Sequence, residues 1–275
     1  MSYRTLMAVP VLGRTNPVLL EATAKLARNL DAGVIGVAAC RPVHAICRDY
    51  AIPASVFEED RKQISRQIHD AELQFRAALA NHSGHVEWNA HTCLEPLAGY
   101  LARESVLADL IVAPLPVGGT PVDATRQPDL SDLVMHAGRP VLLVSSTQVS
   151  TGFDRVLVAW KDTREARRAV ADSLPLLVKA SAVTVVAIED VDGAADARSG
   201  VARVVAWLAR HGIPAKTRTA PPRKANAQQL IELGREIDAN LVVAGACGYV
   251  RQSRWILGGI TSELLNGNTC ALVSH

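Results

Sequence analysis

The segment Leu241–Gly248 has the sequence LVVAGACG, and nine residues separate Gly248 from the pair Gly258 and Gly259. A β-branched apolar run that stops at a glycine is typical of a buried parallel strand that ends in a loop. The residues that follow Gly259 have the apolar spacing of a helix. This stretch therefore predicts a strand, a loop punctuated by glycines, and a helix.

The glycines of this loop, Gly245, Gly248 and Gly258, have two explanations. Glycine lets the backbone approach a ligand closely, and a loop leading into a helix leaves the first helical amides free to bind a phosphate. Glycines after a strand also serve simply as residues of a tight turn. The spacing is neither G-x-x-x-x-G-K-[ST] nor G-x-G-x-x-G, which excludes the two commonest phosphate loops.

The composition favours a buried parallel sheet. Hydrophobic residues make up 49% of the 275 residues while aromatic residues make up only 4%, so valine, alanine, leucine and isoleucine must build the core. The length suits one large domain or two ordinary ones. The net charge is +2, from 29 basic and 27 acidic residues, so we expect neither nucleic acid nor an anionic membrane as a partner.

Targeting signals and cysteine usage predict a cytoplasmic protein. Apolar runs stay well short of the roughly 20 residues that span a bilayer, and the first residues lack the apolar region of a signal peptide. The five cysteines lack the spacing of a disulfide scaffold, which agrees with a reducing compartment.

Strands and helices alternate along the chain and then repeat. In the first half we expect strands at 6–12, 34–40, 85–91, 110–113 and 140–144, with helices at 17–30, 56–81, 96–107 and 129–136. In the second half we expect strands at 156–160, 183–188, 214–218, 241–244 and 270–274, with helices at 164–178, 200–210, 228–237 and after Gly259. Parallel neighbours need crossover helices, so this order predicts open parallel sheets.

The clearest internal match aligns ADLIVA at 108–113 with ANLVVA at 239–244. It predicts two tandem Rossmann-like α/β domains, 1–148 and 149–275, that join near Ser146–Gly152. Each is expected to be a five-stranded parallel open sheet flanked by four helices.

The Gly-x2-Gly-x9-Gly spacing resembles the ATP-binding loop of the universal stress protein family. The sequence VLVAWKDTREARRAVA at 156–171 is similar to the opening of the second domain in bacterial two-domain members, and the resemblance covers nearly the whole chain. It implies a Rossmann-like sheet, a cytoplasmic location, and association through the last strands, which pairs the two halves around a pseudo-twofold axis. Members of the family either bind ATP or lack it.

The ligand crevice of an open parallel sheet lies beyond the carboxyl ends of the strands, where the strand order switches. With the resemblance, this rule predicts an adenine-nucleotide site in the second half that requires no metal. Its candidate residues are Trp160, Lys161, Asp162, Ala187, Ile188, Ala244, Gly245, Cys247, Gly248, Gly258, Gly259, Ile260 and Thr261.

Two positions depart from the family pattern. Lys161 stands where relatives carry an aspartate that reaches toward the nucleoside, and Gly259 stands where they carry serine or threonine. Three roles for this turn stay open: Lys161 meets phosphate, Asp162 replaces the missing carboxylate, or both form a solvated turn that caps the next helix. Arg251 and Arg254 either hold phosphate oxygens or are exposed loop charges.

The first half lacks the glycine loop. Pro114 and Val117 align with Gly245 and Gly248, Leu12 occupies the aspartate position, and the nearby Gly118 and Gly119 do not restore the spacing. Proline and valine block close approach of the backbone to a ligand. We therefore expect that the first domain does not bind ATP and serves packing or partner contact.

Other clusters offer weaker signals. Cys40, His44 and Cys47 follow the second strand, and His91 and Cys93 end the third, so a zinc or redox role and ordinary buried cysteines are both open. Cys247 lies inside the glycine loop, where a redox-sensitive switch is a hypothesis. No serine has a nucleophile-elbow context, so hydrolase chemistry has no support. No basic patch surrounds the tryptophans, so we expect them to be packing residues rather than platforms on which nucleic-acid bases stack.

Together these patterns predict a non-enzymatic regulatory protein. Nucleotide occupancy would order residues 245–259 and change the surface offered to a regulatory protein partner. A homo-oligomer or an intramolecular pseudo-dimer is expected. Two alternatives stay open: a nucleotide-free scaffold or dimerisation protein, favoured by Lys161 and Gly259, and a weak ATP hydrolase, which lacks an evident base.

Overall fold

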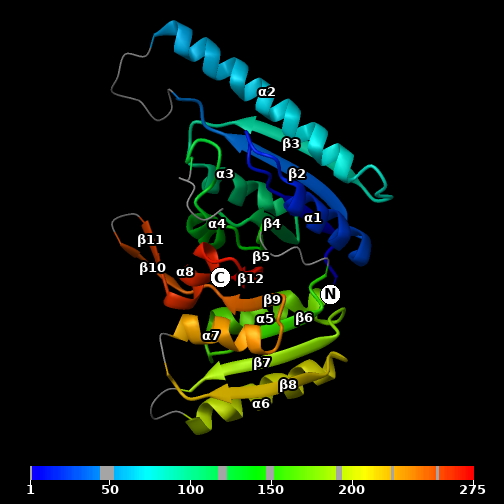
Figure 1. Ribbon diagram of the computed structural model, residues 1–275, viewed down its shortest axis with the longest axis vertical. Coiled ribbons are helices and arrows are strands. Elements are labelled where there is room, and N and C mark those ends of the chain that lie inside the picture. Colours follow the sequence, from blue (N-terminus) through cyan, green and yellow to red (C-terminus); the bar gives the residue numbers. More distant parts are fainter. Residues whose placement is uncertain are drawn as a thin grey trace.

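The computed structural model describes residues 2–43, 53–116, 123–146, 152–189, 194–223, 226–251 and 254–275. Ten strands form one sheet, flanked by helices on both faces (Figure 1). The strands of the first half are β1 (Thr5–Ala8), β2 (Gly33–Cys40), β3 (Val86–Thr92), β4 (Leu110–Pro114) and β5 (Val141–Val144). Those of the second half are β6 (Arg155–Ala159), β7 (Ala182–Ile188), β8 (Ala215–Ala220), β9 (Leu241–Gly245) and β12 (Ala271–Ser274).

The strand order is β3-β2-β1-β4-β5-β12-β9-β6-β7-β8. Within each half all neighbours are parallel, which confirms the predicted α/β fold with its parallel open sheets. The two halves meet where β12 pairs antiparallel with β5, with Leu272 opposite Leu142. This is the pairing through the last strands that the family resemblance implied. The strand order switches between β1 and β4 and again between β6 and β9.

Helices cover the two faces separately. The first half contributes α1 (Pro17–Leu30), α2 (Ala54–Ala78), α3 (Leu97–Glu104) and α4 (Leu130–His136), and the second contributes α5 (Arg164–Leu177), α6 (Ala194–Arg210), α7 (Asn226–Glu236) and α8 (Gly259–Asn266). One of the two large core clusters lies under α1, α2, α5 and α6, and the other lies under α3, α4, α7 and α8. Both run through both halves and consist mainly of valine, leucine, alanine and isoleucine, as the composition predicted.

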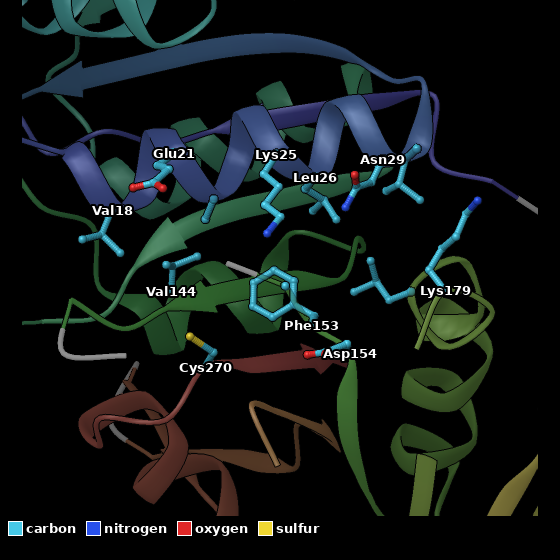
Figure 2. A pocket seen from close by; sticks show the side chains of 14 residues that line it. Val18, Glu21, Lys25, Leu26, Asn29, Val144, Phe153, Asp154, Lys179 and Cys270 are labelled. Carbon is cyan, nitrogen blue, oxygen red and sulfur yellow. The ribbon is translucent and has the colours of Figure 1, made fainter. Parts of the chain in front are cut away.

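The two halves are joined by more than the pairing of β5 with β12. The Tyr3 hydroxyl, in the first half, donates a hydrogen bond to the backbone carbonyl of Asp172 in α5, in the second half. A cavity of about 110 Å³ lies between α1 and the start of the second half, with Lys25, Phe153 and Lys179 around it (Figure 2). The predicted join, residues 146–152, falls mostly outside the described residues.

Three elements differ clearly from the sequence prediction, the first being β1, which ends at Ala8 although a strand was expected at 6–12. The nine residues expected as loop contain a hairpin, in which β10 (Gly248–Arg251) pairs antiparallel with β11 (Arg254–Leu257). Helix α6 begins at Ala194, whereas the predicted helix began at Gly200. A Cβ at Gly200 would lie 2.9 Å from Nε1 of Trp160, so glycine is needed in mid-helix to make room for the indole. No helix of the described residues is long and apolar enough to cross a membrane.

Candidate functional site

The glycine loop connects β9 to α8 beyond the carboxyl end of the sheet, beside the switch in strand order. The Ala246 amide donates to the Ser274 carbonyl at 2.7 Å, so the strand pairing continues one residue past β9. The Cys247 amide donates to Oγ1 of Thr261 at 3.3 Å, and the Gly258 amide donates to the Cys247 carbonyl at 2.8 Å. The buried Thr261 hydroxyl therefore holds the turn together, a role that the sequence did not reveal.

The N-terminus of α8 presents unused hydrogen-bond donors. Gly258 is the N-cap and supplies no side chain, and its carbonyl accepts the first helical bond from the Ser262 amide at 2.9 Å. Within the described part of the chain, the amides of Gly259, Ile260 and Thr261 have no acceptor. Such amides, with the positive end of the helix dipole, bind anions.

The glycines of the motif have different structural roles. A Cβ at Gly245 would lie 2.5 Å from the backbone nitrogen of Ala166, so close packing of α5 on β9 requires glycine there. A Cβ at Gly258 would make only ordinary contact, 3.5 Å from the Cys247 carbonyl oxygen, and a Cβ at Gly259 would meet nothing within 4 Å. Packing in the described structure therefore explains Gly245 and does not explain Gly258 or Gly259.

The turn after β6 borders a groove between α5 and α6. Trp160 and Asp162 line this groove, which has a volume of about 580 Å³, and the Asp162 carboxylate forms an ion pair with Arg167. The carbonyl of the exposed Lys161 accepts a hydrogen bond from the Thr163 amide at 2.7 Å. Thr163 then caps α5, because its Oγ1 accepts from the Ala166 amide at 3.2 Å. The cap of α5 is therefore Thr163, the residue after Asp162.

The remaining candidate residues divide between core and crevice. Ala187 and Ala244 are 3% and 2% exposed and lie in the two core clusters, so their side chains contribute to packing. Ile188 is half-buried and packs on the face that α7 and α8 cover, as does Ile260. Cys247 is exposed and Gly248 is half-exposed. The side chains of Arg251 and Arg254 lie outside the described residues.

A carboxylate stands at the α5 side of this loop. Glu165 packs against Gly245, and its side chain is 16% exposed. A hydrogen bond from its own backbone amide, opposed by burial and aided by Thr163 and Arg164, holds the pKa of the Glu165 carboxyl below its usual range. The group is therefore ionised at neutral pH, and an anion is accommodated better at α8 than beside α5.

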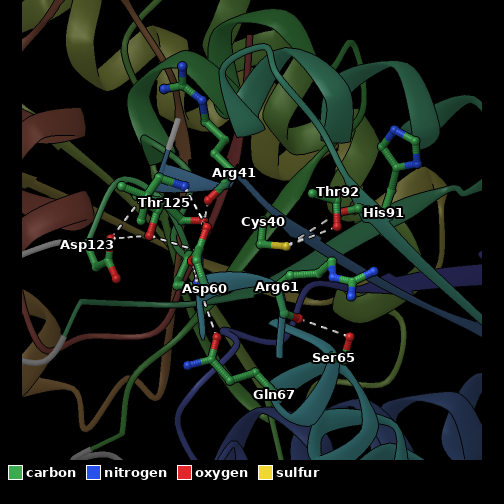
Figure 3. A network of polar contacts seen from close by, with 12 residues as sticks. Cys40, Arg41, Asp60, Arg61, Ser65, Gln67, His91, Thr92, Asp123 and Thr125 are labelled. Atoms are coloured by element: carbon green, nitrogen blue, oxygen red, sulfur yellow. Dashed lines mark hydrogen bonds and ion pairs between the residues drawn. The ribbon is translucent and has the colours of Figure 1, made fainter. Parts of the chain in front are cut away.

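The corresponding place in the first half is covered by residues 123–127. The Arg41 amide at the end of β2 donates to the Thr125 carbonyl at 2.8 Å. The buried Arg126 guanidinium contacts Asp60 at 3.3 Å, the Gln67 side-chain oxygen at 2.7 Å and the Arg41 carbonyl at 2.9 Å. Figure 3 shows this network around the end of β2. Sequence reasoning missed it, because a buried arginine and aspartate look like surface residues in a sequence.

The cysteines of the first half are ordinary buried thiols in the described structure. Cys40 and Cys93 are buried, and burial raises the pKa of both thiols. The described residues contain no group of three side chains suited to a metal ion, and His44 and Cys47 lie outside them. The His91 ring stacks on Tyr100, with centroids 4.8 Å apart. Val117, Gly118 and Gly119 also lie outside the described residues.

Solved structures with the same architecture exist, although no protein-family model matches the sequence and no curated protein matches it. A universal stress protein from Archaeoglobus fulgidus DSM 4304 has a TM-score of 0.70 at 13% identity, over 98% of this chain and 97% of that one. A protein assigned to the universal stress proteins, from Pseudomonas aeruginosa UCBPP-PA14, has a TM-score of 0.64 at 16% identity, over 99% and 93%.

The chain has the fold of the universal stress proteins. A functionally unknown protein from Pseudomonas aeruginosa PAO1 is similar as well, with a TM-score of 0.61 at 16% identity over 99% of this chain and 92% of that one. At these identities the likeness to universal stress proteins establishes the fold, and the function must be argued from the site. The recognition made from the glycine spacing and from residues 156–171 is thus confirmed at the level of the fold.

Proposed function

We propose that the second half of this universal stress protein fold binds an adenine nucleotide and that the chain is a non-enzymatic regulatory protein. The supporting observation is the N-terminus of α8, where Gly258 and Gly259 are exposed, have room for side chains, and adjoin three amides without an acceptor in the described structure. A bound phosphate explains glycine at Gly258, where packing does not, because a bare backbone there lets phosphate oxygens reach the amides.

The proposed phosphate site is smaller than the set of residues that the sequence suggested. Phosphate lies at Gly258, Gly259 and Thr261, while Trp160 and Asp162, which line the α5–α6 groove, are left out of the proposed site. Ile188 is the side chain left to border the nucleoside. The choice of adenine rests on the resemblance of the loop spacing to that of the universal stress proteins. A cytoplasmic location, a regulatory partner and a homo-oligomer stay predictions of the sequence.

Calorimetric titration with ATP tests this proposal on three forms of the full chain. Gly258→Val should weaken ATP binding at least tenfold, because its branched side chain fills the space above the α8 amides. Gly259→Ser serves as the matched control, since its side chain meets open space and its hydroxyl adds a donor worth about fivefold in affinity. Equal affinity of Gly258→Val and the unchanged chain contradicts this placement of the phosphate.

A nucleotide-free scaffold is the second candidate, favoured by the ionised Glu165 beside Gly245 and by the place of Trp160 and Asp162 in the α5–α6 groove. Thermal unfolding separates the two candidates. A ligand at 100 times its Kd stabilises a protein by about 2.7 kcal/mol, whereas a scaffold shows no shift with ATP. Phosphate release at substoichiometric protein tests the weak hydrolase, for which no base is evident.

A further inference from the structure

The first half keeps a crevice at its own switch point. A cavity of about 230 Å³ lies beyond the carboxyl ends of β1 and β4, between the loop after β1, the start of α1 and residues 114–115. Val11, Leu19, Pro114, Leu115 and Val144 give it apolar walls. Open parallel sheets bind ligands at such a crevice, although the glycine loop is missing from this half.

A buried side chain without a partner lines this cavity. Gln127 is only 5% exposed, and its amide group forms no hydrogen bond within the described structure. The amide is not among the fully buried polar atoms that lack a partner, so it keeps accessible surface and can take a ligand as its hydrogen-bond partner. Its neighbour Arg126 is fixed by the ion pair with Asp60 and the hydrogen bond to Gln67, so Gln127 is held beside the cavity by a rigid segment.

The start of α1 supplies further donors. The Asn16 side chain at the N-cap is occupied, because it accepts from the Val11 amide at 2.9 Å and donates to the Val11 carbonyl at 3.1 Å. The amides of Val18 and Leu19 therefore have no acceptor among the described residues, and both residues line the cavity. Arg14, which is half-buried, lines it as well and forms no ion pair there. The Val18 and Leu19 amides, the Arg14 guanidinium and the NH2 group of Gln127 can each donate a hydrogen bond to an anion.

We propose that this crevice binds a small monocarboxylic acid with a short apolar tail. The carboxylate accepts hydrogen bonds from Arg14, Gln127 and the α1 amides, and the tail lies on the apolar walls. A carboxylate with a tail fits better than a phosphate, because Pro17 at the first helical position removes one amide and because the apolar walls leave few partners for further anionic oxygens. The neighbouring end of β2 is occupied by the chain itself, because the Arg41 amide donates to the Thr125 carbonyl there.

The proposal is independent of nucleotide binding in the second half. Its test is to titrate the isotope-labelled full chain with butyrate and with hexanoate and to monitor the amide resonances by NMR. We expect saturable shifts of the Val18 and Leu19 amides and of the Gln127 side-chain amide. Hexanoate should bind more tightly than butyrate because it buries more apolar surface. The neutral butyramide should bind at least tenfold more weakly, because it lacks the charge.

Variants separate a built site from general attraction of anions to this half. Arg14→Met and Gln127→Leu should each weaken butyrate about tenfold, as loss of a hydrogen bond to a charged group predicts. Arg28→Met, which removes an exposed charge from the far end of α1, should leave affinity unchanged. Unchanged shifts of remote amides show that each variant is folded.

Two results would overturn the proposal. One is the absence of saturable shifts at butyrate and hexanoate concentrations of about 10 mM, ten times the Kd of a weak millimolar ligand. The other is equal weakening by Arg14→Met and Arg28→Met. Persistence of butyrate binding in Gly258→Val, with ATP binding lost or absent, keeps this inference separate from the nucleotide proposal.

Discussion

Replacing Gly245 by alanine should destabilise the protein more than its chemistry suggests. The added Cβ would lie 2.5 Å from the Ala166 nitrogen and 2.5 Å from the Glu165 carbonyl carbon, which are backbone atoms that move only if α5 moves. Overpacking of this kind costs about 1–3 kcal/mol. The same shift disturbs the capping bond from the Ala166 amide to Thr163, which contributes about 1 kcal/mol. The expected loss is therefore about 2–4 kcal/mol.

The assay is thermal and urea unfolding of the unchanged chain and of two alanine variants. Gly245→Ala should lower Tm by roughly 5–15 °C. Gly259→Ala is the matched control, because its Cβ meets nothing within 4 Å and its backbone is not left-handed, so it should be neutral or stabilise by about 0.4–1 kcal/mol. A Gly245→Ala protein within 1 °C of the original, or equal losses in both variants, would refute the packing argument.

Three further predictions concern buried and exposed side chains. Arg126→Met should lower the free energy of unfolding in urea by about 3–5 kcal/mol, because it leaves the Asp60 carboxylate buried without its ion pair. Arg61→Met, at an exposed ion pair, is the control and should cost under about 1 kcal/mol. Similar losses in the two variants would contradict a stabilising role for the buried network. Burial raises the pKa of the Cys270 thiol, so its contribution to stability is complete below the unfolded pKa of about 8.5 and is lost as pH rises toward the folded value. Urea midpoints measured against pH should therefore fall less steeply on the alkaline side in Cys270→Ala. Cys247 should be alkylated first among the cysteines that the structure describes, and ATP should slow this reaction if phosphate lies at α8; mass spectrometry without such protection would count against the nucleotide site.

Much of the fold is readable in the sequence because buried parallel strands have a strong local pattern. The run at 241–245 and its repeat at 110–114 became β9 and β4, and the alternation around them gave the parallel halves. The hairpin formed by β10 and β11 was missed, because two four-residue strands with charged ends resemble a loop when read singly. The start of α6 was misplaced because Gly200 looks like a helix boundary until its neighbour Trp160 is known.

The candidate site was less predictable than the fold. The sequence located the loop at Gly245–Gly259 correctly in the topology, since position after a strand is a property of chain order. The sequence did not predict which cavity each side chain lines, and Trp160 and Asp162 line the α5–α6 groove. The first half was expected to be only degenerate, whereas residues 123–127 bond to the end of β2 and Gln127 lines a largely apolar crevice at the start of α1.

The sequence by itself determined the succession of strands and helices along the chain, the internal repeat and the place of the glycine loop. Hydrophobic periodicity and glycine determine local structure through a few neighbouring residues, so these features can be read from the sequence. Tertiary structure alone decided that Gly245 serves packing while Gly258 and Gly259 do not. It alone decided that Arg126 and Asp60 are a buried pair. These roles depend on contacts between residues far apart in the chain, and only the folded molecule brings such residues together.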